Sequence, residues 1–363
     1  MTGPVKSVRP ADLHAQGAES LTLAAHGFFW VGGERVETAS GPALRGQMYV
    51  EYWIPRALRH RWPLVLIHGG GGQGLDFLGT VDGREGWAHW FVRQGYAVYV
   101  VDRPGHGRSP FHPDALGAMG PLPSSAFLEE WFCRPQEFPD RYPQAHLHDK
   151  WPGAGRLGDQ YFDHFLAGAG PAQADIVRAH RDTQTATAAL LDVIGPAMLL
   201  THSAGGPAGW LAADIRPTLL KAIIAVEPIG PPFAQRAEGA LHWGLTASPL
   251  TFDPPASAPE DLKLEVRPPA RPGTVGCLVQ QSPARRLPNL CGFPIVIVTA
   301  EASWMATDNH GTVDFLRQAG AHVDHLRLDE CGVRGNGHAM MLETNSDEVA
   351  AVIDRWVTEK GLA

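Results

Sequence analysis

The chain has 363 residues, of which 44% are hydrophobic, and a formal net charge of −8. This length allows one large domain or two smaller ones, and an acidic balance without a basic cluster argues against nucleic acid and anionic membrane surfaces as partners. No run approaches the roughly 20 apolar residues of a membrane span, and residues 1–16 lack the apolar core of a signal peptide. A cytoplasmic protein is therefore expected, unless an export signal was trimmed from the chain.

The four cysteines leave the redox compartment open. Cys277 and Cys291 bracket a proline-rich loop at a spacing that allows a disulfide, whereas Cys133 and Cys331 stand alone. A single candidate pair in so long a chain favours reduced thiols. No zinc-ligand spacing is present, and neither a metal nor a cofactor is expected.

The first elements expected are β-strands. Residues 20–36 are rich in β-forming residues and contain Gly32-Gly33, which predicts a hairpin that turns at those glycines. Residues 46–54 read as a further strand. This hairpin precedes the main sheet, and packing on a second copy would make the protein a homodimer.

Short apolar runs then alternate with helix-compatible runs. Strands are predicted at residues 63–67, 96–101, 196–200, 221–226, 293–299 and 323–328, and the uninterrupted apolar run at 63–67 is typical of a strand buried on both faces. Amphipathic helices are predicted at residues 84–94, 175–193, 204–213, 312–318 and 345–360. Strands separated by helices pair in parallel through right-handed crossovers. The sequence therefore predicts an α/β fold with a mostly parallel central sheet flanked by helices.

Two long segments, 111–170 and 230–290, interrupt this alternation. Both are rich in proline and glycine and show no clear period. Irregular segments of this length are typical of caps over a site, so we expect one domain over residues 1–363 with two inserted caps. Within the first segment, His146 and His148 have a metal-ligand spacing, but a solvated or hydrogen-bonded loop is the favoured interpretation.

Residues 199–206, Leu-Leu-Thr-His-Ser-Ala-Gly-Gly, lie between a predicted strand and a predicted helix. Ser203 is therefore expected on a sharp turn, where small neighbours are needed. Thr201 replaces the first glycine of the usual G-x-S-x-G pattern. The alternative is a serine that only caps the helix.

The strand at residues 63–67 ends in the glycine-rich loop 68–74. A phosphate-binding loop would continue with Gly-Lys-Ser/Thr, which is missing here. An oxyanion hole requires only one backbone N–H from such a loop. A plain flexible loop is the remaining alternative.

Polar candidates follow several strands, and the ends of parallel strands meet along one edge of a sheet. Ser203, Glu227 and His338 occur in the order nucleophile, acid, histidine. Serine needs a base to become a nucleophile, and the base needs a carboxylate to fix its tautomer. This chain order is typical of one class of hydrolase.

The motifs at residues 68–70, 102–109, 201–205 and 335–340 together resemble the α/β-hydrolase superfamily, from about residue 63 to the C-terminus. The resemblance implies an α/β-hydrolase fold, with Ser203 as nucleophile and His338 as general base. It also implies that the backbone N–H groups of Gly70 and Ala204 form the oxyanion hole.

The position of the acid departs from the commonest pattern of that superfamily. Most members carry Asp after the strand that corresponds to residues 293–299, and Ser303 stands there in this chain. Glu227 follows the preceding strand and is the preferred acid, with Glu301 as second choice. The chain resembles the bacterial esterase 713 group, which has an N-terminal hairpin, a glutamate after the sixth strand and a Trp-Pro-Gly turn, here residues 151–153.

The resemblance implies hydrolysis of a carboxylic ester through an acyl-enzyme. We expect Trp151, Trp243 and Trp304 to line an apolar substrate pocket, which favours a small-molecule ester or lactone with a bulky apolar part. Lactone or carbon–carbon bond hydrolysis on the same triad is one alternative. The other is a binding module that kept the fold without catalysis.

Overall fold

An eight-stranded sheet forms the centre of the protein, in the order β1-β2-β4-β3-β5-β6-β11-β12. The computed structural model describes residues 20–236, 239–269 and 271–363. The strands are β1 (Leu23–Thr38), β2 (Gly41–Pro55), β3 (Leu64–Ile67), β4 (Val98–Asp102), β5 (Ala197–His202), β6 (Leu220–Val226), β11 (Ile295–Thr299) and β12 (Val323–Arg327). The pairs β1-β2 and β2-β4 are antiparallel, and every other neighbouring pair is parallel. The mostly parallel sheet and the N-terminal hairpin predicted from the sequence are confirmed.

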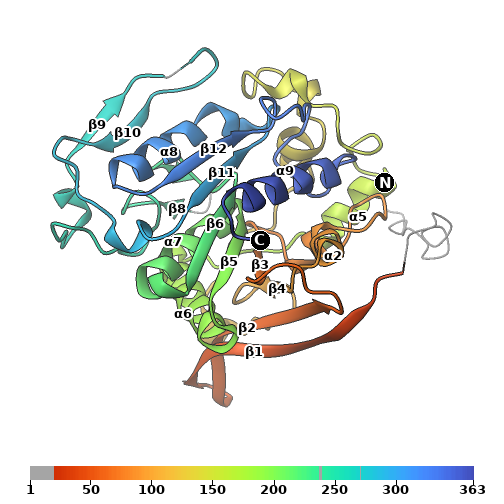
Figure 1. The fold of residues 1–363 in the computed structure, drawn as a ribbon, viewed down its shortest axis with the longest axis horizontal. Helices are drawn as coiled ribbons and strands as arrows, with labels where there is room; N and C mark the ends of the chain where they lie inside the picture. Colours follow the sequence, from red (N-terminus) through yellow and green to blue (C-terminus); the bar gives the residue numbers. More distant parts are fainter. Residues whose placement is uncertain (1–19, 237–238, 270) are drawn as a thin grey trace.

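Helices cover both faces of the sheet (Figure 1). Helices α6 (Ile176–Ile194), α7 (Gly206–Ile215) and α8 (Asn309–Gln318) contribute to one hydrophobic cluster, and α2 (Trp87–Gln94) and α9 (Ser346–Glu359) contribute to the other. Successive residues of a strand divide between the clusters: Val65 and Ile67 belong to the first, Leu64 and Leu66 to the second. A parallel strand therefore reads as a continuous apolar run because both of its faces are buried.

The two irregular segments contain only short elements. The first carries α3 (Pro113–Leu116), α4 (Ser125–Leu128) and α5 (Gln160–Gly168), and the second carries the ribbons β7 (Gln235–Arg236) with β8 (Gly239–Ala240) and β9 (Leu264–Arg267) with β10 (Cys277–Gln280). In Figure 1 the β9-β10 ribbon projects beside α8. Among the described residues, no helix combines the length and hydropathy needed to cross a bilayer.

The predicted position of the hairpin turn is wrong. Residues 20–36 do not fold back at Gly32-Gly33; β1 continues through both glycines, and the chain turns between Thr38 and Gly41. Gly32 has φ +64°, and a Cβ atom there would lie 2.9 Å from the backbone Cα of Ala186 in α6. The glycine is thus required for the close approach of a helix. Figure 1 shows the resulting hairpin as a long curved ribbon along one side of the molecule.

The four cysteines are free thiols. Cys291 donates to the carbonyl of Leu287, and the sulfur of Cys277 lies 3.7 Å from His310 Nε2. Cys277 and Cys291 do not form the alternative disulfide in this structure.

We predict that Gly32→Ala lowers the free energy of unfolding by about 2 kcal/mol or more, since the new methyl group adds a clash to the cost of the left-handed backbone. The matched control is Gly361→Ala, two residues after α9, where φ is +67° but no atom lies within 4 Å of the added Cβ. That control bears only the backbone cost, about 1 kcal/mol. Equal losses for the two variants in urea denaturation would contradict the close-approach explanation.

Candidate active site

Ser203 lies on a strained turn between β5 and α7. Its φ is +51°, in the left-handed region that non-glycine residues rarely adopt. The following glycines permit the turn: a Cβ on Gly206 would lie 2.6 Å from the Cβ of Pro228. Thr201 stands where the usual pattern has glycine, and its methyl group lies beside Gly209 of α7, where an added Cβ would be 3.5 Å away, in ordinary contact. Strain of this kind is held only where the surrounding structure fixes it.

Three side chains that are distant in the sequence meet at this turn. Ser203 Oγ lies 2.8 Å from His338 Nε2, and His338 Nδ1 lies 2.5 Å from Glu227 Oε2. A carboxylate only accepts hydrogen bonds, so Nδ1 donates to Glu227 and Nε2 is left to accept from the serine hydroxyl. The side chains of His338 and Glu227 are fully buried. Burial lowers the pKa of His338, so its imidazole is neutral at pH 7 and able to take up a proton.

Glu227 follows β6 directly and also has a positive φ, +43°. Burial raises the pKa of its carboxyl group, and hydrogen bonds from Ser303 and Ala300 act in the opposite direction. Ser303 Oγ donates to Oε2 at 2.7 Å, and the backbone N–H of Ala300 donates to Oε1 at 2.8 Å. Both hydrogen bonds favour the charged form of the buried Glu227 carboxyl group. The serine at the usual aspartate position thus supports the glutamate from the neighbouring strand.

Glu301, the second candidate for the acid, does not reach His338. Its Oε1 pairs with Arg334 at 2.6 Å, and its Oε2 accepts from the backbone N–H of Gly335 at 3.0 Å. Glu301 therefore fixes the start of the loop that carries His338.

A second buried carboxylate holds the same loop, and sequence reasoning missed it. Glu343 is fully buried and accepts hydrogen bonds from the backbone N–H of Gly337 at 2.9 Å, from Asn336 Nδ2 at 2.7 Å and from His148 Nε2 at 2.8 Å. The His146–His148 spacing therefore reflects a histidine that pairs with a carboxylate, while His146 is exposed. In the described part of the chain, no group of three or more His, Cys, Asp or Glu side chains could hold a metal ion.

The glycine-rich loop after β3 borders the serine. Gly70 lines the same pocket as Ser203, and its backbone N–H donates to no other described residue. Asp102 at the end of β4 anchors this loop: its Oδ1 accepts from the N–H of Gly74 at 2.5 Å, and its Oδ2 accepts from Arg108. Ala204, the other predicted oxyanion-hole residue, follows Ser203 in the turn.

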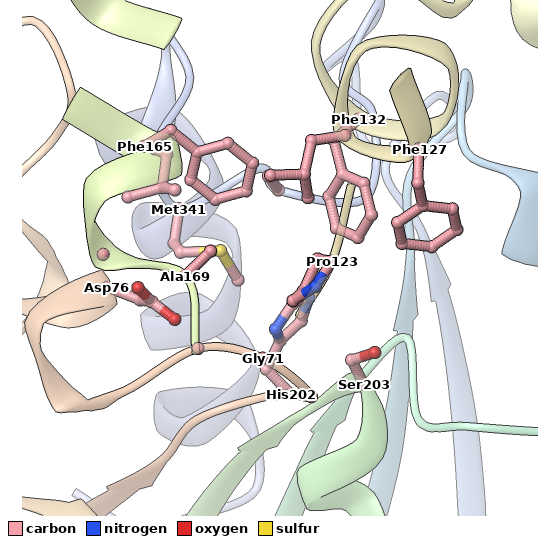
Figure 2. A pocket seen from close by; sticks show the side chains of 17 residues that line it. Gly71, Asp76, Pro123, Phe127, Phe132, Phe165, Ala169, His202, Ser203 and Met341 are labelled. Carbon is pink, nitrogen blue, oxygen red and sulfur yellow. The ribbon is translucent and has the colours of Figure 1, made fainter. Parts of the chain in front are cut away.

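An apolar pocket opens above Ser203 (Figure 2). Its cavity volume is about 60 Å³. Segment 111–170 contributes six of its apolar side chains, Pro123, Phe127, Leu128, Phe132, Phe165 and Ala169. None of the described residues between 230 and 290 lines it.

The three tryptophans expected at the substrate pocket lie in different places, and none is among the pocket-lining residues. The ring of Trp304 lies 4.2 Å from that of His338, and Trp151 packs behind the pocket residue Phe165. Trp243 packs against Phe252 in the cluster formed with α6, α7 and α8. The sequence alone does not show that the ring of Trp243 packs in the hydrophobic core and not in the pocket.

A family model described as the alpha/beta hydrolase fold matches residues 63–246, so the chain belongs to the α/β-hydrolase family. It is 38% identical over 337 residues to a protein named "Probable secreted lipase phiG" from Fungal sp. (strain ATCC 74256), and the match covers 92% of this chain and 89% of that protein. A solved structure described as "The Atomic Resolution Structure of a Novel Bacterial Esterase" shares the fold, with a TM-score of 0.64, 24% identity and coverage of 94% of this chain and 98% of that one. The chain is an α/β-fold hydrolase similar to esterases and lipases.

We predict that Glu343→Gln lowers the free energy of unfolding by about 2–3 kcal/mol, because an amide N–H₂ would face donors that now bind a buried carboxylate. Urea denaturation measures this loss. The control is Glu348→Gln, an exposed position at the start of α9, where a change within about 0.5 kcal/mol is expected. A loss no larger than that of the control would show that Glu343 does not hold the loop.

Proposed function

We propose that this protein is a serine esterase that hydrolyses a carboxylic ester through Ser203, His338 and Glu227. The observation that carries the proposal is the continuous hydrogen-bonded chain from the Ser203 hydroxyl through both nitrogens of His338 to a buried carboxylate, with distances of 2.8 and 2.5 Å. Nucleophile, base and orienting acid are the parts that acyl transfer through serine requires. The glutamate after β6 also supports the resemblance to the bacterial esterase 713 group.

The first half of the reaction forms an acyl-enzyme. His338 Nε2 accepts the proton of Ser203 as Oγ bonds to the ester carbonyl carbon, and the resulting oxyanion accepts from the backbone N–H groups of Gly70 and Ala204. A donor of this kind contributes about 3 kcal/mol to the transition state. The carbon–oxygen bond to the alcohol then breaks, and His338 returns its proton to the departing alkoxide oxygen.

The second half of the reaction releases the acid. A water molecule gives a proton to His338 while its oxygen bonds to the acyl carbon, and the bond to Ser203 Oγ breaks as that oxygen regains the proton. Glu227 remains ionised throughout and stabilises the imidazolium that forms twice.

The pocket supports an ester with an apolar acyl or alcohol part. Apolar side chains from segment 111–170 surround the space above Ser203, and we propose that this segment is the cap that excludes water from the reaction. The apolar walls favour an apolar chain as the part of the ester that fills this space. An ester panel of increasing acyl length, together with several lactones, measures which chains are accepted.

The proposal is tested by covalent labelling with a fluorophosphonate, which phosphonylates an activated serine. We expect the wild type to be labelled at Ser203 and to hydrolyse short esters, and we expect Ser203→Ala to lose labelling and at least about 10³-fold in kcat. Circular dichroism checks that the variant is folded. Unchanged hydrolysis by folded Ser203→Ala would refute the assignment of the nucleophile, and a wild type that neither labels nor hydrolyses would indicate a binding module.

The choice of acid generates a separate prediction. In Glu227→Gln the amide N–H₂ donates to His338 Nδ1, so Nε2 keeps the proton and no longer accepts from the serine. We expect kcat to fall about 10³- to 10⁴-fold. Glu301→Gln should lower kcat less than about tenfold, because its contacts to Arg334 and Gly335 only position the loop. A larger loss in Glu301→Gln than in Glu227→Gln would reverse the assignment.

A further inference from the structure

One polar side chain in the apolar pocket takes no part in the proposed reaction. Asp76 belongs to the short turn Gly74–Phe77 that follows the glycine-rich loop, and its side chain is one of those lining the pocket. Figure 2 shows its carboxyl group directed into the space beside Ala169 and Met341, on the side of the pocket away from Ser203. Asp76 is half-buried there, and a carboxylate among apolar side chains is stabilised by a hydrogen-bond donor or a cation.

The partners of Asp76 account for only part of its hydrogen-bonding capacity. Oδ2 accepts from the backbone N–H of Gln73 at 3.2 Å, a local contact that closes the turn. Among the described residues, no donor reaches Oδ1, and no Lys, Arg or His forms an ion pair with the carboxyl group. Arg108 instead donates to Asp102, the neighbouring acidic side chain.

The environment of Asp76 makes an additional donor favourable. Burial raises the pKa of Asp76 to about 7, the hydrogen bond from Gln73 lowers it, and the charge of Asp102 raises it further. A bound group that donates to Oδ1 would offset this loss of hydration. The pocket is otherwise lined by glycine, apolar side chains, Ser203 and His202, and His202 already contacts the carbonyl oxygen of His338 at 3.0 Å.

We propose that Asp76 selects esters whose pocket-bound part ends in a hydrogen-bond donor, a hydroxyl or an ammonium group, carried on an apolar chain. The chain contacts the aromatic and aliphatic walls, and the terminal donor binds Oδ1. A half-buried acceptor that a bound substrate covers also discriminates against purely apolar substrates, because they leave the carboxyl group unpaired. This inference rests on the proposed esterase function and adds the class of substrate to it.

The test compares methyl esters of straight-chain acids that end in a hydroxyl, an ammonium or a methyl group, at several chain lengths, by kcat/KM. For the wild type we expect the donor-bearing esters to exceed the matched methyl-terminated ester by about tenfold or more at one chain length. Asp76→Asn retains an oxygen acceptor and the bond from Gln73, so it should keep the preference for the hydroxyl ester and lose the preference for the ammonium ester. Asp76→Leu should lose both preferences while the methyl-terminated ester is hydrolysed at least as well.

Asp114→Asn is the matched control, since it removes one negative charge from the exposed face of α3 and should leave every ratio unchanged. Should Asp76→Leu fail to fold, the ammonium ester with Asp76→Asn still decides the question. A wild type that labels at Ser203 and hydrolyses all three ester types equally well overturns this inference alone. A wild type with neither labelling nor ester hydrolysis overturns the esterase proposal, and this inference with it.

Discussion

The structure around the serine depends on one buried carboxylate. Glu227 has no exposure to solvent, and its oxygens accept from His338, from Ser303 and from the backbone of Ala300. The donors come from the end of β11 and from the loop before α9, and Glu227 itself follows β6, so satisfying the charge fixes all three segments relative to one another. The energetic reason is that an ionised group without water is tolerated only when its hydrogen bonds are complete.

Two further carboxylates hold loops in the same way along this edge of the sheet. Asp102 accepts from the backbone of the glycine-rich loop, and Glu343 accepts from the loop that carries His338. Through His148, Glu343 also attaches that loop to segment 111–170, the proposed cap. The backbone around the serine is therefore held by carboxylates that receive amide hydrogen bonds. Asp76 differs because one of its oxygens faces the pocket without a donor.

Some features were predicted correctly from the sequence and others were not, and each outcome has a physical reason. All six predicted central strands occur. The inner strands are mostly apolar because both of their faces are buried under helices, whereas the edge strand β12 carries Asp324, His325 and Arg327. The pair Gly32-Gly33 was misread because a turn and a close helix contact require the same residue type. Trp243 was expected at the pocket but packs in the core. The reason is related: an aromatic residue has the same sequence pattern in a core as in a pocket wall.

Local sequence determined the strand and helix pattern, the turn that carries Ser203, and the order of serine, acid and histidine along the chain. Only the tertiary structure decided which carboxylate meets His338, which partner binds His148 and which side chains surround the serine. The contacts of His338 with Glu227 and Ser203 span 111 and 135 residues. Periodicity and turn chemistry act over a few neighbouring residues, whereas these distant contacts depend on how the complete sheet and its connecting loops pack together.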